Sequence, residues 1–349
     1  MPSQRSSKLF DPIQVGAFNL QHRVVLAPLT RGRADAASIP APYTTDYYAQ
    51  RATPGGLLIT EGTFIHPEGA GRLYSPGRRI AEPDLVSAVY SPGMKPYFDN
   101  DDTSRKTPDK AAVIEKFTTM AEADIDRFVE HYRQAALNAM EAGFDGVELH
   151  GANGYLIDQF LQSTSNDRQD QYGGSVENRI KFPLRVVNAI SEAIGAERVG
   201  VRMSPFTRFQ GMREADPLSL FVPWAQAIVN AHPSIAYIHA IEPRADGAAD
   251  TLDHVQKEVE SLDPIREVAT RAGVNFIAAG GFTPESALEH ASETDDLVGF
   301  GRHFIPNPDL PARIKNGWTL TKYDRSTFYK TNEVGYSDYT AYTADKVAA

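Results

Sequence analysis

The amino-acid sequence predicts an α/β protein of the TIM-type (β/α)8 barrel class. Short apolar runs alternate with helix-like stretches along the chain, and this alternation is typical of a parallel sheet. No GxGxxG motif follows the first run, which argues against an open dinucleotide-binding sheet. A length of 349 residues is within the range of one barrel. We therefore expect one domain over residues 1–349 that ends in a tail rich in aromatic residues.

Seven apolar runs have the length and the polar or glycine ends of barrel strands. They are His22–Leu29, Gly56–Gly62, Gly143–His150, Arg198–Pro205, Ile235–Pro243, Asn275–Phe282 and Asp296–Arg302. Apolar residues three and four apart predict helices over Asp124–Ala142 and Val176–Ile194. Seven strands with helices between them favour a barrel over a doubly wound sheet.

The alternation is interrupted once, between Gly62 and Gly143. Only Leu85–Tyr90 in this stretch resembles a strand, and much of the remainder consists of turn-forming and charged residues. A closed eight-stranded barrel needs one more strand here. Either Leu85–Tyr90 supplies that strand or the barrel is incomplete around its third strand.

Composition limits the classes of function. A net charge of −10 argues against nucleic-acid binding, which needs a basic surface. The chain has no cysteine, so disulfides, thiolate metal sites and cysteine nucleophiles are excluded. The first residues lack the apolar core of a signal peptide, and no window reaches the ~20 apolar residues of a membrane helix. We expect a cytoplasmic monomer or homodimer that acts on a small molecule and contains no metal.

Three polar side chains lie at the end of the run Gly143–His150 and in the loop after it, where barrel enzymes place their working residues. His150 and Asn153 can both donate hydrogen bonds to one carbonyl oxygen, which would make the β-carbon of a conjugated C=C accept hydride. Tyr155 is a weak acid that could deliver a proton to the α-carbon. The alternative is that His150 and Asn153 cap the next helix and Tyr155 packs. Three such residues at one strand end favour the catalytic interpretation.

Arg202 is an unusual residue for a barrel strand. It alternates with Val201 and Met203 and therefore lies on the opposite face from them. If that face is the barrel interior, an unpaired guanidinium there would be unfavourable. An anionic ligand ring, such as a reduced flavin, is one possible partner. An internal ion pair with Glu148 or Glu242 is an equally good one.

The last two runs end in glycine-containing loops directly before helix starts. Gly280 and Gly281 form one loop, and Gly301 and Arg302 the other. Loops after strands seven and eight are the usual phosphate site of barrels, because glycines let backbone N–H groups approach the phosphate. Glycines that serve only tight turns are the alternative.

Two further groups could contact a planar ligand. Thr30 follows the first run and can donate a hydroxyl hydrogen bond to a ring carbonyl. The aromatic tail could cover the ring, and it comprises Phe328, Tyr329, Tyr336, Tyr339 and Tyr342. Packing is the better explanation for the tail, except at Phe328 and Tyr329.

The ordered motifs identify a family resemblance. HGANGYL at His150–Leu156, YGGSVENR at Tyr172–Arg179, YIHAIEPR at Tyr237–Arg244 and GFGRHFIPNPDLPARI at Gly299–Ile314 resemble the old yellow enzyme family in order and spacing. The resemblance covers nearly the whole chain outside residues 80–115, and the chain looks most similar to fungal members, including those of secondary metabolism. It implies an FMN-dependent oxidoreductase in which NAD(P)H, for example NADPH, reduces the flavin and the flavin reduces an α,β-unsaturated carbonyl compound.

The resemblance also implies residue roles. His150 and Asn153 would hold the substrate carbonyl, and Tyr155 would donate the proton. Phe328 and Tyr329 would flank the substrate. The flavin would be bound by Ala27, Pro28, Thr30, Gly62, Arg202, Gly280, Gly281, Gly301 and Arg302.

The sequence departs from the family pattern after Ser75–Gly77. The helix and third strand that the family has here, with a glutamine that binds the flavin, are absent. Flavin could still bind more weakly, the barrel could be open and flavin-free, or the protein could be poorly active. The rival function is an isomerase or cyclase that uses His150, Asn153 and Tyr155 without flavin. A non-catalytic relic is the third possibility.

Overall fold

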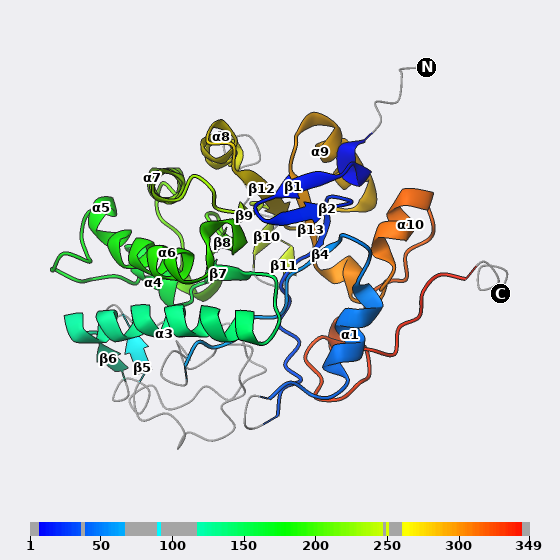
Figure 1. Cartoon of the computed structure of the whole chain (residues 1–349), viewed down its shortest axis with the longest axis horizontal. Helices are drawn as coiled ribbons and strands as arrows, with labels where there is room; N and C mark the ends of the chain where they lie inside the picture. Colours follow the sequence, from blue (N-terminus) through cyan, green and yellow to red (C-terminus); the bar gives the residue numbers. More distant parts are fainter. Residues whose placement is uncertain are drawn as a thin grey trace.

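The computed structural model describes residues 7–35, 39–66, 89–91, 117–246, 249–250 and 260–343. Seven parallel strands form one curved sheet in the order β4–β3–β13–β12–β9–β8–β7 (Figure 1). The strands are β3 (Val24–Leu26), β4 (Leu57–Leu58), β7 (Val147–Gly151), β8 (Val199–Met203), β9 (Tyr237–Ile241), β12 (Asn275–Ala279) and β13 (Leu297–Phe300). Each of the seven predicted runs overlaps one of them, and the barrel-type fold is confirmed.

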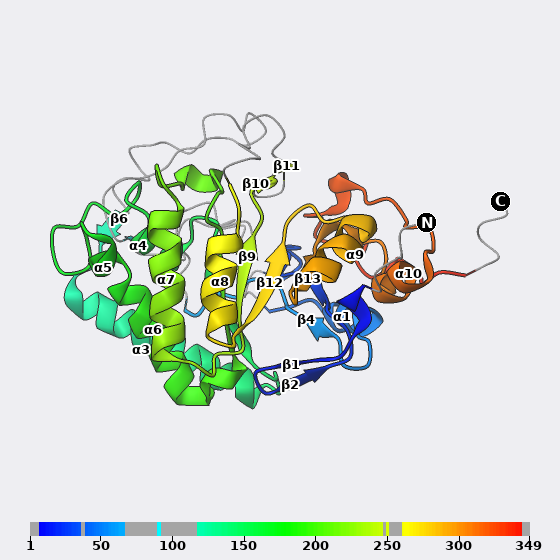
Figure 2. The ribbon, with the colours of Figure 1, turned by 90° about the horizontal axis from the view of Figure 1, so that it is seen from above.

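Helices cover the outside of the sheet, and α3, α6, α7 and α8 lie one after another along it (Figures 1 and 2). The helices are α1 (Thr44–Arg51), α3 (Glu122–Glu141), α4 (Leu156–Leu161), α5 (Val176–Arg179), α6 (Lys181–Ile194), α7 (Leu218–Ala231), α8 (Asp263–Arg271), α9 (Pro284–Glu293) and α10 (Leu310–Asn316). The helix predicted over Asp124–Ala142 is α3. The one predicted over Val176–Ile194 divides at Ile180 into α5 and α6. Among the described helices, none has the length and apolarity needed to cross a membrane.

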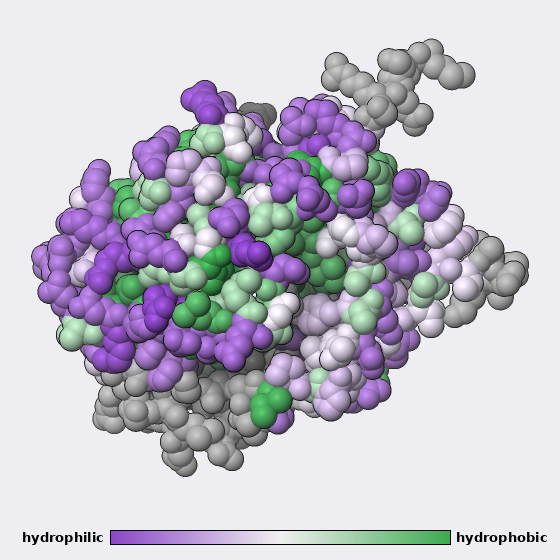
Figure 3. Space-filling model, in the orientation of Figure 1, coloured by the Kyte–Doolittle hydropathy of each residue, from purple (hydrophilic) through white to green (hydrophobic). Residues whose placement is uncertain are grey.

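Alternate strand residues form two separate apolar clusters, one on each face of the sheet. Val24 and Leu26 pack in the outer cluster with the helices, whereas Val25 between them belongs to the inner one. Ile277 and Leu297 are also in the inner cluster. Burying one such side chain contributes about 1.5–3 kcal/mol, so the two-residue period of the strands fixes which face points inward. On the face drawn in Figure 3, hydrophilic residues cover most of the rim and hydrophobic ones gather toward the middle.

A short hairpin closes the inner cluster at the end where the parallel strands begin (Figure 2). It is formed by β1 (Ile13–Val15) and β2 (Phe18–Leu20), which pair antiparallel. Val15 and Leu20 join the inner cluster, and the Ala17 N–H donates to the Glu197 carbonyl at 2.9 Å. The opposite end, where the strands stop, is thereby left for the site.

The sheet does not close within the described residues. β4 and β7 are the two edge strands of this sheet, and they do not pair with each other. β5 (Val89–Ser91) pairs in parallel with β6 (Phe117–Thr119) in a separate small sheet, so the described part of the candidate strand Leu85–Tyr90 does not fill the gap. The junction after Ser75–Gly77 lies outside the described residues. Over the part of the chain that the structure describes, the barrel is therefore incomplete around its third strand.

Candidate functional site

One large pocket lies inside the curved sheet, with a volume of about 1420 Å³. Small-molecule pockets usually measure about 300–1,000 Å³, so this one has room for a cofactor and a substrate together. It extends to α3, which faces the open side between β4 and β7, where Tyr132 and Ala136 line it. All the site residues predicted from the sequence line this pocket: Ala27, Pro28, Thr30, Gly62, His150, Asn153, Tyr155, Arg202, Gly280, Gly281, Gly301, Arg302, Phe328 and Tyr329.

The loop between β7 and α4 is held in an unusual backbone conformation. Asn153 has φ 58°, in the left-handed region that asparagine tolerates better than most residues. Its N–H donates to Ser204 Oγ at 2.8 Å, and its carbonyl accepts from Gln210 Nε2 at 2.8 Å. Groups from the end of β8 and beyond therefore fix the position of this loop.

The side chains of this loop do not cap the following helix. Tyr155 is the residue before α4, and no side chain bonds to the first turn from that position. The Oδ1 of Asn153 is buried without a hydrogen-bond partner in the described part of the chain. The rings of His150 and Tyr155 lie 5.1 Å apart at a 59° tilt. The capping alternative is therefore not what the structure has, and the Asn153 side chain lines the pocket.

His150 is neutral at ordinary pH. Burial, with the positive charge of Arg202 added to it, lowers the pKa of the His150 imidazole to about 3. A neutral imidazole keeps one N–H as a donor and does not bring a charge into the pocket.

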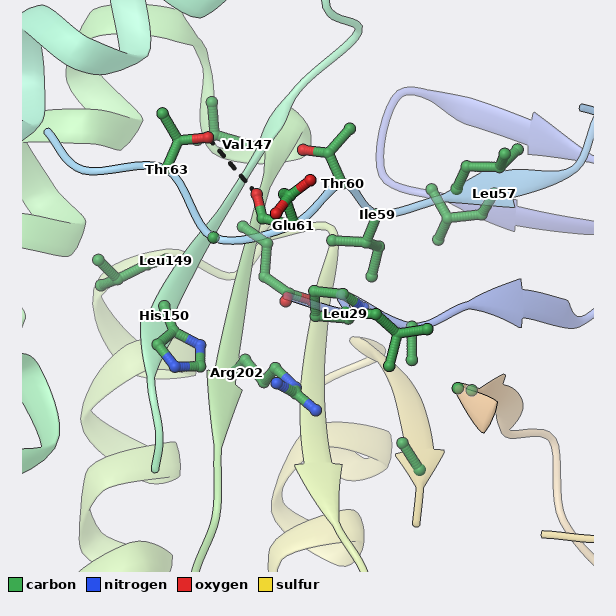
Figure 4. A pocket seen from close by; sticks show the side chains of 18 of the residues that line it. Leu29, Leu57, Ile59, Thr60, Glu61, Thr63, Val147, Leu149, His150 and Arg202 are labelled. Atoms are coloured by element: carbon green, nitrogen blue, oxygen red, sulfur yellow. Dashed lines mark hydrogen bonds between the residues drawn. The ribbon is translucent and has the colours of Figure 1, made fainter. Parts of the chain in front are cut away.

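Arg202 and His150 are neighbours across β7 and β8, and Figure 4 shows both side chains at the pocket wall. Arg202 is 9% exposed, and its Nε has no hydrogen-bond partner among the described residues. The two predicted ion-pair partners do not bond to it. Glu148 instead accepts from His239 Nδ1 at 2.7 Å, and the charged neighbours of Glu242 include Arg244 and Arg266. A buried cationic donor without a partner is the strongest sign of a ligand in this pocket.

The two glycine loops lie side by side because β12 and β13 are adjacent in the sheet. Gly280 and Gly281 have φ 115° and 68°, a region in which other residues are strained. The Gly280 carbonyl accepts from Arg244 Nε at 2.6 Å. Arg302 follows Gly301 and reaches the Tyr323 hydroxyl at 3.3 Å. The arrangement offers backbone N–H groups and a guanidinium to an anion.

The C-terminal tail is tied to the site by two buried arginines. Arg31 donates to the Phe328 carbonyl at 3.2 Å and to the Gly335 carbonyl at 2.7 Å, and Arg33 donates to the Phe328 carbonyl at 2.7 Å. These bonds hold Phe328 and Tyr329 at the pocket. Elsewhere in the tail, packing explains the aromatic residues. Tyr336 stacks on Tyr47 at 4.1 Å, and Tyr342 stacks on Trp318 at 4.5 Å.

Sequence reasoning missed two charged residues that shape the pocket. Glu61 accepts from the backbone N–H groups of Arg31 and Gly32 at 3.1 and 3.2 Å, so it orders the loop after β3. Arg244 supports the Gly280 loop. Both follow strands at the end where barrel sites form, and a search of every strand end for charged residues would have found them.

Comparison with known proteins identifies the family. The model of the NADH:flavin oxidoreductase / NADH oxidase family matches residues 8–82 and 93–321. Flavin oxidoreductase hxnT of Emericella nidulans is 41% identical, with 95% of this chain and 97% of that protein covered. Chanoclavine-I aldehyde reductase fgaOx3 of Penicillium roqueforti is 39% identical, with 97% of each chain covered. The alignment with hxnT runs over 375 positions, more than the 349 residues of this chain, so hxnT has residues that this chain lacks.

Solved structures agree with the sequence relatives. The old yellow enzyme homologue from Zymomonas mobilis superposes with a TM-score of 0.80 at 32% identity, with 96% of this chain and 100% of that chain covered. Morphinone reductase gives a TM-score of 0.81 at 32% identity, with 98% of each chain covered. The resemblance to old yellow enzymes is confirmed, and the chain belongs to the NADH:flavin oxidoreductase / NADH oxidase family.

Proposed function

We propose that this protein is an FMN-dependent ene-reductase that uses NAD(P)H to reduce the activated C=C of a small α,β-unsaturated carbonyl compound. The single observation that carries the proposal is Arg202 Nε, buried without a hydrogen-bond partner among the described residues, in the same pocket as His150 and Asn153. We expect a cytoplasmic monomer or homodimer. The relatives support a carbonyl compound as substrate, because they include an aldehyde reductase and 12-oxophytodienoate reductases.

The residues present fit FMN. Arg202 would offer a buried cationic donor to the edge of the ring that becomes negative on reduction, and Thr30 would offer a hydroxyl to a ring carbonyl. Ala27, Pro28 and Gly62 would contact the ring through the backbone. The loops of Gly280–Gly281 and Gly301–Arg302 would hold the phosphate. When bound, FMN supplies hydride transfer between the nicotinamide cofactor and the substrate.

His150 and Asn153 would hold the substrate carbonyl oxygen. Two donors aimed at one oxygen stabilise the negative charge that develops there as hydride reaches the β-carbon. Because the pKa of His150 is lowered to about 3, the imidazole acts as a neutral donor throughout the physiological range. Phe328 and Tyr329 would pack against the apolar part of the substrate.

Tyr155 would complete the reaction by donating its hydroxyl proton to the α-carbon. Its ring lies 5.1 Å from that of His150, so one small substrate can reach both side chains. General acid catalysis of this kind contributes about 10²–10⁴-fold in rate.

The missing segment would weaken flavin binding without removing the main proposed contacts. Two lost neutral hydrogen bonds would reduce the binding free energy by about 0.5–1.5 kcal/mol each. The donors proposed for the ring edge and the phosphate are on β8 or follow β12 and β13, and none of these is an edge strand of the described sheet. A cofactor bound by charged groups can tolerate such a loss.

One observation favours the second candidate function, a flavin-independent isomerase or cyclase. The sheet is open between β4 and β7, the region where the family places its third strand. His150, Asn153 and Tyr155 could act there on a carbonyl compound without any redox step.

Tyr155→Phe separates the two candidates. Purified wild-type and variant proteins are reduced by NADPH under anaerobic conditions and then mixed with cyclohexenone. We expect both to accept hydride from NADPH equally fast, and the variant to form saturated ketone at least 100-fold more slowly. Tyr339→Phe, in the tail, is the matched control. If flavin reduction also collapsed in Tyr155→Phe, Tyr155 would not be the proton donor; isomerised product without NADPH would support the second candidate.

A further inference from the structure

We propose that Glu148 is the internal counter-ion of Arg202. His239 and Tyr237 bond to the Glu148 carboxylate and keep it from bonding to the Arg202 guanidinium. The pocket would thereby contain a charge-balanced cation whose donors remain free for the ring. The inference rests on the proposed function, since the ring is that of FMN, and it assigns positioning roles to Glu148, His239 and Tyr237.

The strand register brings these residues together. Gly200 of β8 pairs with Glu148 of β7 on one side and with Tyr237 of β9 on the other. Two residues further along β8, Arg202 pairs with His239 of β9. Because residue 200 is glycine, β8 has no side chain between Glu148 and Tyr237. The ring of Tyr237 occupies that place, 2.2 Å from where a Cβ of residue 200 would be. Glu148 and Tyr237 can therefore meet across β8.

The carboxylate of Glu148 accepts hydrogen bonds from two neighbouring side chains. His239 Nδ1 lies 2.7 Å from Glu148 Oε2, and the Tyr237 hydroxyl also bonds to Glu148. The side chains of Glu148 and His239 are 5% and 0% exposed. Burial lowers the pKa of His239, so its ring is neutral and donates through Nδ1. Burial alone would raise the pKa of Glu148, but His239 and the charge of Arg202 keep it below its usual value, so Glu148 stays ionised.

Arg202 experiences this negative charge without bonding to it. Its guanidinium is always protonated in proteins, and Glu148 is the carboxylate whose charge acts on it most strongly. Nevertheless Arg202 Nε has no partner in the described part of the chain. A direct ion pair would satisfy Glu148 and use up the donors that the ligand needs. The bonds from His239 and Tyr237 prevent this competition.

The arrangement has a defined consequence for the ring. The charges of Arg202 and Glu148 cancel while the ring is neutral, and Arg202 can still donate to the ring when reduction makes it negative. Removing the charge of Glu148 should therefore favour the reduced, anionic ring. Removing His239 should have a different effect, because Glu148 would then bond to Arg202 and compete with the ligand.

The test compares Glu148→Gln, His239→Leu and the double variant with the wild type. The affinity of each apoprotein for oxidised FMN is measured by fluorescence quenching, and the midpoint potential of each holoprotein against a reference dye. Glu148→Gln should leave the affinity unchanged and favour reduced FMN about tenfold, which is about 30 mV more positive for a two-electron couple. His239→Leu should weaken FMN binding about tenfold, and the double variant should recover it.

Two results would overturn the proposal. A lower potential in Glu148→Gln would mean that Glu148 holds Arg202 in place and does not balance its charge. No recovery in the double variant would mean that His239 acts through packing alone. If His239→Leu does not fold, Tyr237→Phe replaces it; this variant removes one bond to Glu148 and should weaken FMN binding in the same direction by a smaller factor.

A flavin-free measurement keeps this inference separable from the proposed function. If the wild type takes up no FMN, the proposed function fails and the apoprotein is studied by NMR of arginine Nε–H groups, with the Arg202 signal assigned from Arg202→Met. His239→Leu should move that signal downfield as Glu148 bonds to it, and Glu148→Gln should reverse the shift. An Arg202 signal that is unchanged in His239→Leu would refute the counter-ion role.

Discussion

The two halves of the barrel interior differ in chemistry. The half formed by β3, β4, β12 and β13 is apolar and includes Val25, Leu57 and Ile277. The half formed by β7, β8 and β9 contains Glu148, His150, Arg202 and His239. Tyr237 connects the halves, because its ring belongs to the apolar cluster and its hydroxyl bonds to Glu148.

The difference shows which half stabilises the fold and which performs chemistry. Apolar burial stabilises a protein wherever it occurs, whereas buried charged groups are unfavourable unless they are compensated. In the polar half, Glu148 and His239 bond to each other, whereas Arg202 Nε has no hydrogen-bond partner among the described residues. It also ends at β7, the edge where the sheet is open. The comparison therefore predicts that changes in the polar half affect ligands and pH response, and changes in the apolar half affect stability.

The largest expected effect is on catalysis in the polar half. Replacing His150 and Asn153 together by alanine removes both donors to the substrate carbonyl. We expect the rate of enone reduction to fall about 10³-fold, or about 4 kcal/mol in activation free energy. Binding of a phenol should be lost while flavin reduction by NADPH persists, as stopped-flow absorbance would show. His232→Gln, which changes a histidine bonded to Asn188 outside the pocket, is the control. Unchanged phenol binding would refute the carbonyl-binding role.

Substitutions in the apolar half should lower the stability of the fold and leave ligand binding almost unchanged. Ile277 is fully buried in the inner cluster, and Ile277→Ala should lower the free energy of unfolding by about 3 kcal/mol. Urea denaturation measures this, and the FMN affinity of the folded variant should change little. A variant as stable as the wild type but with impaired FMN binding would contradict the division into two halves.

A third prediction concerns the pH dependence of stability. The pKa of His150 falls from an ordinary 6.5 in the unfolded chain to about 3 in the folded protein. The unfolded chain therefore binds a proton below about pH 6.5 that the folded protein does not, and stability falls as the pH is lowered. Between pH 7.5 and 5 this one residue should reduce the free energy of unfolding by about 2 kcal/mol.

Urea titrations of the wild type and His150→Gln at both pH values check this. The variant should lose about 2 kcal/mol less than the wild type on acidification, while the remaining buried histidines titrate in both. Equal losses in the two proteins would mean that His150 is already protonated or solvated in the folded state.

The smallest expected effect is at Thr30, which follows β3 at the pocket end of the apolar half. Thr30→Val removes one neutral hydrogen bond to the ring and should weaken FMN binding about fivefold, or about 1 kcal/mol. Fluorescence titration of the apoprotein measures it, with Thr270→Val on exposed α8 as control. An unaltered dissociation constant would place the Thr30 hydroxyl away from the ring.

The sequence was sufficient to predict elements whose signal is local. Alternating and helical apolar periods located the seven strands and the helices α3, α5 and α6, and strand ends located the residues of the pocket. The sequence could not predict whether the barrel closes, because strand pairing depends on contacts between residues distant in sequence. In the structure β5 pairs with β6, and β4 and β7 remain unpaired with each other. The role of Glu148 was missed for the same reason. From the sequence, Glu148 was a candidate ion-pair partner of Arg202, whereas in the structure the Glu148 carboxylate bonds to His239.

The most direct test of the central claim is the visible absorption spectrum of the purified protein after incubation with excess FMN and desalting. Arg202→Met, treated identically, is the matched variant. The account predicts that the wild type keeps the yellow flavin band, that NADPH bleaches it, and that Arg202→Met loses most of it. A wild type that remains colourless, or an Arg202→Met protein that keeps as much flavin as the wild type, would contradict the account.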